Sequence, residues 1–509
     1  MNNNGKPKWL RTVTGLTAIA ALTVPVLAAC NKGSTGDDKT ERVLRIATQY
    51  YAEEDEYFRQ QFTEIFEYNN PNIKLEIVSA MNPNQYRYGG RPEGEKPEDP
   101  YAKMKELLNS DNPPDVVMMN FDQLPDLIAN NMLQQLDTNI TKDKFDISDI
   151  VPAVIDGIKS VGDGKLFALA PTFSSQILMY NKKPFDDAGV PYPKDGMTWD
   201  EMFDLARRVS KGDGDNRVYG FAFNTYSSGS KENLFYEMDP YTSSLQLRMF
   251  NDAVDGLTVA SPSWEKVWTS MIQLSKEKVL PEPIDYSKMD AVRRAAMDDG
   301  GGYNPFQNNY FMNGRLAMTL GQQYSLNEVI QANKNAQNIK GYTPIDWDIV
   351  TMPTHPEQKG IGGNVYFNGL MGINAKAQNP ADAWKFVKFI NGEDWARLKS
   401  KSVNMLVSRS KYIQPRDGLQ YNIKAFTALK PAPVEDEMSK VYRQNQNIGQ
   451  IRSMGLQYFK KAIDGTSTVG DALKEWQTAG DAALKQLKEN PNAPINVMPR
   501  ASGSMMMMP

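Results

Sequence analysis

The sequence predicts an α/β fold with parallel neighbouring strands, because strand and helix patterns alternate near its beginning. Residues 43–47 form a short apolar run, and residues 73–78 alternate apolar and polar side chains. Between them, apolar residues in the segment 58–66 recur with the spacing of one helix face. A third apolar run at residues 115–119 completes the strand–helix–strand order that is typical of an open α/β sheet.

Two later helices have clear start signals. Thr198 can accept a hydrogen bond from the backbone at Glu201, whose side chain can reach back three residues to close a capping box. The second helix is predicted to begin at Pro380, which suits a first helical turn, and apolar residues in the segment 383–390 then face inward. Both helices are therefore expected to cover a sheet.

The N-terminus has the three parts of an export signal. Three basic residues precede an apolar stretch at residues 13–27, and residues 27–30 have the sequence Leu-Ala-Ala-Cys. This tetrapeptide resembles the lipobox of bacterial lipoproteins, in which the signal is cut before the cysteine and the thiol carries diacylglycerol. The resemblance implies that residues 1–29 are removed and that Cys30 holds the mature chain at the outer face of the cytoplasmic membrane, with a Gram-positive cell surface expected.

Two other interpretations of this leader are weaker. One is an ordinary signal peptide in which Cys30, the only cysteine of the chain, stands by chance. The other is a retained membrane helix, but Pro25 interrupts the apolar stretch and the stretch is shorter than the ~20 residues that a span requires. Residues 31–40 are small and polar, which favours a flexible tether.

Composition excludes several kinds of function. The 509 residues include 57 basic and 61 acidic side chains, and this mild acidity argues against nucleic-acid binding. A mature chain of 480 residues suits two or more domains. With one cysteine and one histidine, a Cys/His zinc site cannot form, and a Ser-His-Asp triad would need His355. His355 lies in a polar, proline-flanked loop and is expected to be solvated, so carboxylate chemistry is the main enzymatic option left.

Two acidic motifs predict no bound ion. Asp213 and Asp215 resemble the start of a calcium loop, but Arg217 and Asn224 stand at the fifth and twelfth positions, where ligands are needed. A polar turn is the better interpretation, with calcium as the alternative. Residues 298–302 join two aspartates to three glycines without the spacing or the lysine of a phosphate-binding loop, which favours a flexible connection.

Several short blocks in a fixed order resemble one family, the extracellular solute-binding proteins of bacterial ABC importers, carbohydrate-binding branch (family 1 type). The similarity spans about residues 43–400, and the chain departs from the family in its length and in an unusual segment at residues 86–100. The blocks are residues 114–117, 133–137, 163–169, 179–185, 188–191, 198–201, 218–221 and 311–318.

The resemblance implies a two-lobed periplasmic-binding-protein fold (type II) whose lobes are joined by crossing hinge strands and close over a ligand. Crossings are expected near residues 171–173, 320–321 and 369–373. The expected division is a lipidated cysteine and tether at 30–42, lobe 1 at 43–172 and 322–372, lobe 2 at 173–321 and 373–500, and a disordered tail at 501–509.

The ligand is expected beyond the carboxyl ends of the strands, where open α/β sheets bind their ligands. Nearly every predicted strand end offers an aromatic residue beside an amide or a carboxylate. Aromatic rings suit the apolar face of a pyranose, and planar polar groups suit its hydroxyls. The alternative is that these are ordinary half-buried loop aromatics. The predicted ligand-binding residues are Tyr50, Tyr51, Glu53, Asn120, Asp122, Phe173, Tyr226, Gln322, Gln323, Tyr324, Asn364, Tyr366 and Asn368.

The leading hypothesis is a non-enzymatic, monomeric binding lipoprotein that captures a carbohydrate, expected to be an oligosaccharide, and delivers it to permease subunits without a cofactor or metal. The first alternative is an extracellular glycosidase that uses two carboxylates. The second is an interaction or structural lipoprotein that uses the same closure without transport. Neither the sugar nor its length follows from the sequence.

Overall fold

The computed structural model describes residues 40–51, 55–82, 98–226, 230–283, 304–362, 365–401, 405–432, 447–490 and 495. The leader unit, Met1–Thr40, is separate from the main unit, Glu41–Pro509, and only the main unit is treated below. The signal peptide, Cys30, Glu53, Asn364, residues 298–302 and the tail at 501–509 lie outside the described residues. Within the described ranges, no helix combines the length and apolar character needed to cross a membrane.

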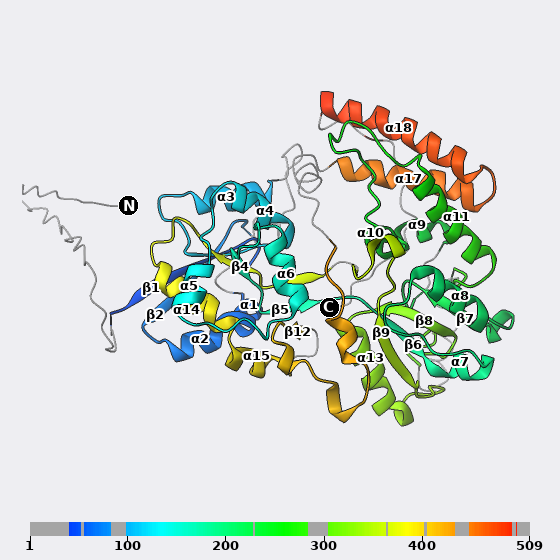
Figure 1. Cartoon of the computed structure of the whole chain (residues 1–509), viewed down its shortest axis with the longest axis horizontal. Coiled ribbons are helices and arrows are strands. Elements are labelled where there is room, and N and C mark those ends of the chain that lie inside the picture. Colours follow the sequence, from blue (N-terminus) through cyan, green and yellow to red (C-terminus); the bar gives the residue numbers. More distant parts are fainter. Residues whose placement is uncertain are drawn as a thin grey trace, which may run out of the picture. The chain divides into compact units, whose positions relative to one another are not determined.

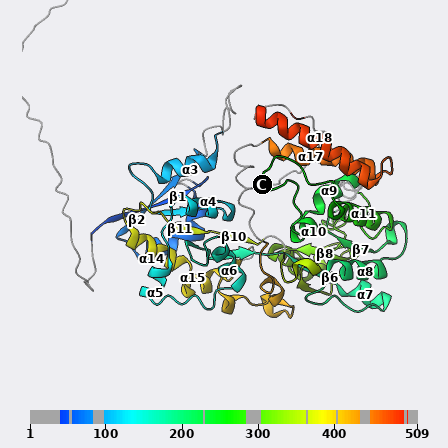
Figure 2. The same cartoon turned by 45° about the horizontal axis from the view of Figure 1, so that its top comes forward.

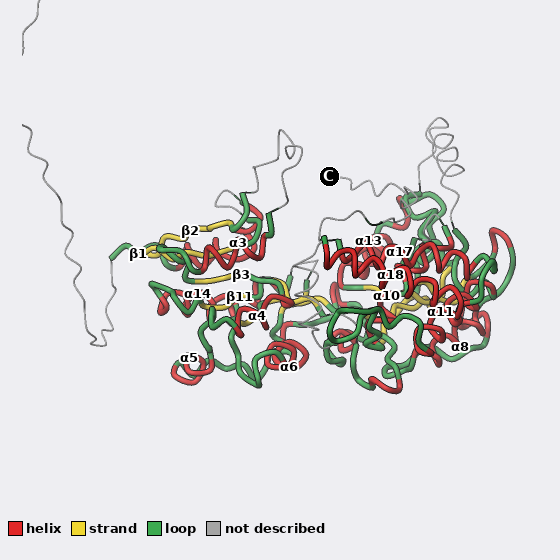
Figure 3. Tube along the Cα trace, turned by 90° about the horizontal axis from the view of Figure 1, so that it is seen from above, coloured by secondary structure: helices red, strands yellow, loops and turns green. Residues whose placement is uncertain are grey.

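The first sheet has the strand order β2-β1-β3-β11-β4 (Figure 1). Its strands are β1 (Arg42–Thr48), β2 (Ile73–Ser79), β3 (Val116–Met118), β11 (Met371–Ile373) and β4 (Ala168–Leu169). β1 runs parallel to both β2 and β3, as the sequence predicts, and β11 is antiparallel to β3 and β4. Figure 3 shows β1 and β2 side by side at one edge of this sheet.

Helices surround the first sheet, and this sheet with its helices is called lobe 1 below. The segment predicted as one helix contains a π-helical turn at Arg59–Thr63 between α1 and α2. α3 contacts β1, α6 contacts β4, and α14 contacts β11. The helices are α1 (Glu56–Phe58), α2 (Glu64–Asn69), α3 (Pro100–Leu108), α4 (Leu124–Ala129), α5 (Asp137–Lys142), α6 (Pro152–Ser160), α14 (Pro380–Ile390) and α15 (Glu393–Lys399).

The second sheet has the order β7-β8-β6-β9, and with its helices it is called lobe 2. Its strands are β7 (Tyr219–Ala222), β8 (Leu316–Gly321), β6 (Ile177–Asn181) and β9 (Trp347–Thr351). α17 and α18 pack side by side in Figures 1 and 2, and α11 contacts both. The helices are α7 (Lys182–Ala188), α8 (Trp199–Val209), α9 (Leu234–Glu237), α10 (Asp239–Ser244), α11 (Pro262–Lys276), α13 (Gln323–Lys334), α17 (Ile448–Ile463) and α18 (Val469–Glu489).

A third, small sheet joins the two others and is called the hinge sheet. It has the order β10-β5-β12, with β5 (Thr172–Ser174), β10 (Tyr366–Asn368) and β12 (Leu406–Val407) all paired antiparallel. β5 lies between β4 of the first sheet and β6 of the second, where the first crossing was predicted. β10 leads directly into β11 of the first sheet.

The sheet membership differs from the predicted division at three places. The segment 322–346 was assigned to lobe 1, but α13 contacts β8 of the second sheet. β9 was assigned to lobe 1, but it pairs with β6 along its whole length. α14 and α15 were assigned to lobe 2, but α14 packs on β11 of the first sheet and α15 contacts α14.

The crossing predicted near residues 320–321 is therefore wrong, because Gly321 is still paired with Ile177 and α13 follows within the same lobe. A strand pattern followed by a helix pattern predicts these two elements, but it does not predict which sheet the next strand joins.

Both predicted helix starts are confirmed. Thr198 Oγ1 accepts a hydrogen bond from Glu201 N (3.2 Å), and Glu201 Oε2 accepts one from Thr198 N (2.7 Å), so the capping box is closed. α14 begins at Pro380 and buries one apolar face. These local signals are reliable because each depends on residues within one turn.

Strand β6 separates two hydrophobic cores. Ile177 and Met179 belong to a core that extends from the first sheet through the hinge sheet. Leu178 and Tyr180 point to the other face, into a core shared with α8, α11, α17 and α18. This alternation is the period of two that a strand imposes.

Candidate functional site

Strand register shows that the carboxyl edge of the second sheet adjoins the hinge sheet. β8 and β9 both run antiparallel to β6, so they point in the same direction, and β7 is parallel to β8. Ile177, the first residue of β6, lies opposite Gly321 and Thr351, the last residues of β8 and β9. Because β5 ends three residues before Ile177, the hinge sheet meets this carboxyl edge.

The first sheet meets the hinge sheet in the same way. Met371, the first residue of β11, lies opposite Met118 and Leu169, which end β3 and β4. β4 continues into β5, and β10 continues into β11. The carboxyl edges of both sheets are therefore next to the hinge strands, which is where ligands bind in open α/β sheets.

Four of the predicted tyrosines are unusually exposed for aromatic residues, with exposed fractions between 47% and 61%. Tyr50 follows β1, and Tyr226 follows β7. Tyr324 is the second residue of α13, directly after β8, and Tyr366 begins β10. Each therefore stands at a carboxyl edge or in the hinge sheet and exposes part of an aromatic side chain to solvent.

Amide side chains accompany these tyrosines. Asn120 is exposed after β3, and its Nδ2 lies 3.5 Å from Oε1 of Gln49, a half-buried residue after β1 that is not among the predicted ligand-binding residues. Gln322 is half-buried after β8, and its backbone N donates to Ser325 Oγ (3.2 Å). Asp122 and Asn368 are also half-buried.

Comparison with known proteins identifies the family. The sequence pattern of the family described as bacterial extracellular solute-binding protein matches residues 92–415. The chain belongs to the bacterial extracellular solute-binding proteins. A relative in Brucella abortus (strain 2308), named only as a binding protein, is 22% identical over 470 residues, which cover 91% of this chain and 96% of the relative.

Solved structures show the same two-lobed fold. A sugar transporter from Rhizobium etli in an open conformation has a TM-score of 0.56 at 18% identity, covering 87% of this chain and 99% of its own. A family 1 solute-binding protein from Alicyclobacillus acidocaldarius has a TM-score of 0.57 at 15% identity, covering 88% and 100%. The sugar-binding protein MalE from Xanthomonas citri has a TM-score of 0.56 at 15% identity, covering 88% and 98%.

Two predicted site residues, Phe173 and Gln323, are buried rather than exposed at the strand ends. Phe173 is fully buried in β5, with Phe367 and Leu406 opposite it in the neighbouring strands. Gln323 is 2% exposed at the start of α13, next to the exposed Tyr324. Burial argues against ligand contact for both residues, because Phe173 is the middle residue of β5 and Gln323 is covered while its neighbour Tyr324 is exposed.

Tyr51 is intermediate. It is half-buried and packs against Phe58, with ring centroids 5.2 Å apart. Its backbone carbonyl accepts a hydrogen bond from Thr48 Oγ1 (2.5 Å). Burial raises the pKa of Tyr51 and is the largest of the causes that do so. The ring of Tyr51 is therefore partly covered by α1 and offers less surface than the exposed Tyr50.

Glu328 is a site residue that the sequence analysis missed. Its carboxylate accepts a hydrogen bond from the side chain of Tyr226, which links α13 to the end of β7. Surrounding protein partly desolvates this carboxyl and raises its pKa, although the side chain still reaches solvent. The signal was available: Glu328 lies four residues after Tyr324, and residues at that spacing share one helix face.

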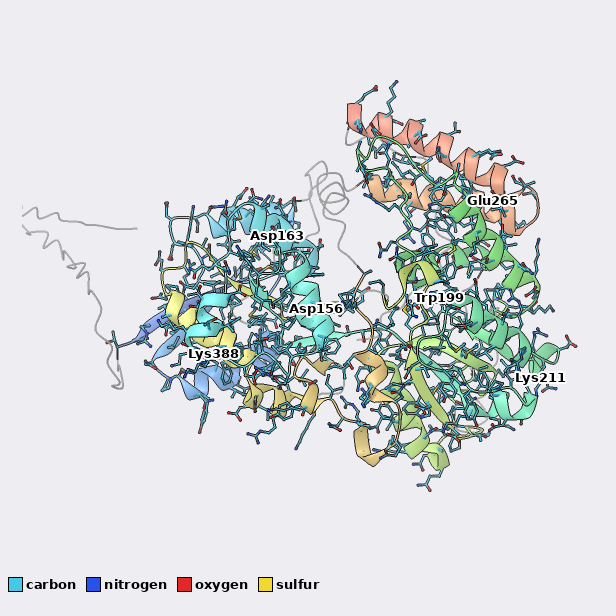
Figure 4. The ribbon with its side chains drawn as sticks, viewed as in Figure 1. Asp156, Asp163, Trp199, Lys211, Glu265 and Lys388 are labelled. Atoms are coloured by element: carbon cyan, nitrogen blue, oxygen red, sulfur yellow. The ribbon has the colours of Figure 1, made fainter. Side chains whose placement is uncertain are left out.

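His355 is buried rather than solvated, contrary to the expectation from its loop. Its Nε2 lies 2.9 Å from the carbonyl oxygen of Tyr241 and donates a hydrogen bond to it. The imidazole packs against the rings of Tyr241 and Trp199. Trp199 is the first residue of α8 and is labelled in Figure 4. Burial lowers the pKa of His355. These contacts make it a packing residue of lobe 2.

The structure describes the first acidic motif, whereas residues 298–302 lie outside the described residues. Residues 213–217 form a turn of 3-10 helix before β7, and Arg217 donates to the carbonyl of Gly212 (2.6 Å). Across the described ranges, no group of three His, Cys, Asp or Glu residues is placed to hold a metal ion.

Proposed function

We propose that this solute-binding protein captures an oligosaccharide outside the cell and delivers it to the permease of an ABC importer, without catalysing a reaction. The observation that carries the proposal is the set of half-exposed tyrosines at the carboxyl edges of both sheets and in the hinge sheet, beside exposed or half-buried amides. Tyrosine rings can cover the C–H face of a pyranose while amides pair with its hydroxyls. The Rhizobium etli and Xanthomonas citri proteins are described as a sugar transporter and a sugar-binding protein, which supports a sugar as the class of ligand.

Thermal-shift measurement of the mature chain against neutral and acidic oligosaccharides tests the proposal. A ligand that binds only the folded state raises the melting temperature by mass action. We expect at least one oligosaccharide to raise it in a concentration-dependent manner and to be recovered intact. Release of a shorter sugar would instead support the glycosidase alternative, and a panel without any shift would overturn sugar binding.

We also propose that Cys30 carries the lipid anchor and that the mature protein acts as a monomer on the cell surface. A thioether-linked lipid would be the hydrophobic attachment that remains after leader removal. Cys30→Ala, expressed in a Gram-positive host, should therefore appear in the medium or remain as an uncleaved precursor. Cleaved variant that stays on the membrane like the wild type would contradict the anchor.

A further inference from the structure

A cavity of about 190 Å3 lies in lobe 2. It is lined by parts of α9, α10, α11, α17 and α18 and by the segment 247–250. α9 separates it from a smaller cavity of about 30 Å3 that includes Tyr226 at the end of β7. Phe235 of α9 lines the larger cavity and Leu234 lines the smaller one, so the two are close neighbours.

The deeper wall of the larger cavity is apolar. Phe250 and Trp476 are almost completely buried, and Trp264 is 8% exposed. The indole N–H of Trp264 already donates to the carbonyl of Arg248 (2.9 Å), and that of Trp476 donates to the carbonyl of Ile451 (3.1 Å). This wall therefore offers carbon surface and no indole donor to a ligand.

Two guanidinium groups and one carboxylate line the same cavity. Arg452 of α17 forms an ion pair with Asp239 at the start of α10. The guanidinium of Arg452 also lies over the rings of Tyr236 and Phe235, 5.4 Å and 5.9 Å from their centroids. Cation–π contacts of this kind hold the group in place before a ligand arrives.

The second guanidinium is weakly held by its acidic partner. Arg248 forms an ion pair with Asp252, whose side chain is 91% exposed, so that solvent screens the attraction. Asp252 does not line the cavity. Burial raises the pKa of Asp239 and outweighs the lowering by Arg452. With Arg248 and Arg452 against Asp239, basic side chains outnumber acidic ones in the lining. The lining as a whole favours an anion.

We propose that this cavity binds a uronic-acid unit of the captured oligosaccharide, with the sugar carboxylate between Arg452 and Arg248 and the ring on the apolar wall. The inference rests on the proposed function and specifies its substrate class. The cavity is smaller than the about 300–1,000 Å3 typical of pockets for drug-sized ligands, which suits one sugar ring. Guanidinium groups are well matched to carboxylates because they donate parallel hydrogen bonds.

Isothermal titration of the mature chain tests the proposal with matched sugar pairs. The probes are trimers of galacturonate, glucuronate, mannuronate and guluronate, each beside its carboxyl-reduced neutral counterpart. We expect at least one acidic trimer to bind about ten- to a hundredfold more tightly than its counterpart, since hydrogen bonds to charged groups are the stronger ones. In Arg452→Met this preference should fall to near unity.

Arg207→Met is the matched control. Arg207 is in lobe 2, has the same 36% exposed side chain as Arg452 and pairs with Glu277 (2.8 Å), but does not line the cavity. It should lose its ion pairs with Glu277 and Asp204 and keep the acidic preference. Circular dichroism and melting temperature should show that both variants are folded.

Three results would overturn the inference. Equal affinity for acidic and neutral trimers would remove the uronic-acid preference while leaving sugar binding intact. A preference that persists in an Arg452→Met/Arg248→Met double variant would place the acidic subsite elsewhere. Failure of every saccharide to bind the folded wild type would overturn the proposed function and this inference together.

Discussion

The hinge sheet and the carboxyl edge of the second sheet both contain aromatic side chains, but in opposite environments. In the hinge sheet, Phe173 and Phe367 lie opposite each other and are buried. At the carboxyl edge, Tyr226 and Tyr324 remain half-exposed. A ring inside a strand with partners on both sides holds the crossing chain together, whereas a ring beyond the last paired residue has no strand to cover it. The first kind serves stability and the second is available for binding.

Phe173→Ala should have the largest effect and should act on stability. Removing a fully buried phenylalanine from between β10 and β12 should cost about 3–5 kcal/mol of unfolding free energy. Urea unfolding followed by circular dichroism measures this cost. Phe173→Leu is the control, because it keeps most of the buried volume and should lose much less. A stable Phe173→Ala protein with weakened sugar affinity would place this ring in the binding site after all.

Tyr324→Ala should have the reverse profile. If its exposed ring stacks on the sugar at the centre of the site, truncation should cost about 2 kcal/mol of binding free energy, roughly thirtyfold in affinity. The melting temperature should change little, because the ring contributes little to the core.

Tyr68→Ala is the control for Tyr324→Ala. Tyr68 is 85% exposed on α2 and does not follow a strand, so neither its affinity nor its stability should change. Equal loss of affinity in both variants would show that exposure alone, rather than position at the carboxyl edge, explains the effect.

The difference between these two regions also marks what the sequence could predict. The strand–helix alternation, the capping box at Thr198 and the exposed tyrosines depend on neighbouring residues, and all of them are visible in the sequence. The fate of Phe173 depends on β10 and β12, which come about 190 and 230 residues later in the chain. Assigning β9 and α14 to the right lobe requires knowledge of the same distant pairings.

His355 shows the same limit within a loop. Its proline-flanked, polar surroundings predict solvation, but the backbone bridge between Thr198 and Thr354 brings it against Trp199 and Tyr241. Local polarity gave no sign of this contact, because the partners are more than 100 residues away. The imidazole of His355 is therefore a buried ring like Phe173, but it can also take up a proton, and this protonation can be measured.

His355 should make lobe 2 less stable in acid. Burial lowers its folded-state pKa below the ordinary value of about 6.5, so the unfolded chain takes up a proton first as the pH falls. Stability should be complete above pH of about 6.5 and decrease below it, by at most about 1.4 kcal/mol per pH unit for one proton. Asp200 and Glu357 raise this pKa and Lys266 lowers it, but burial has the largest effect.

Urea unfolding at pH 7.5, 6.5 and 5.5 measures the contribution of His355, with His355→Gln as the comparison. The variant keeps a side-chain donor near the Tyr241 carbonyl and has no imidazole to titrate at position 355. Its unfolding free energy should fall less steeply with acid than that of the wild type. Identical slopes for the two proteins would show that the imidazole keeps its ordinary pKa.

Glu328 offers the smallest and most specific test of the carboxyl edge. Its hydrogen bond with Tyr226 connects α13 to the segment after β7, so it should orient the tyrosine ring for binding rather than contribute to the core. Glu328→Leu removes the acceptor and should weaken sugar affinity by about 1 kcal/mol, roughly fivefold. Glu328→Gln retains an acceptor oxygen and should restore most of the affinity, while the melting temperatures of all three proteins stay close. Equal weakening in both variants would mean that the charge of Glu328 contacts the sugar directly, and unchanged affinity in both would mean that Tyr226 needs no support from α13.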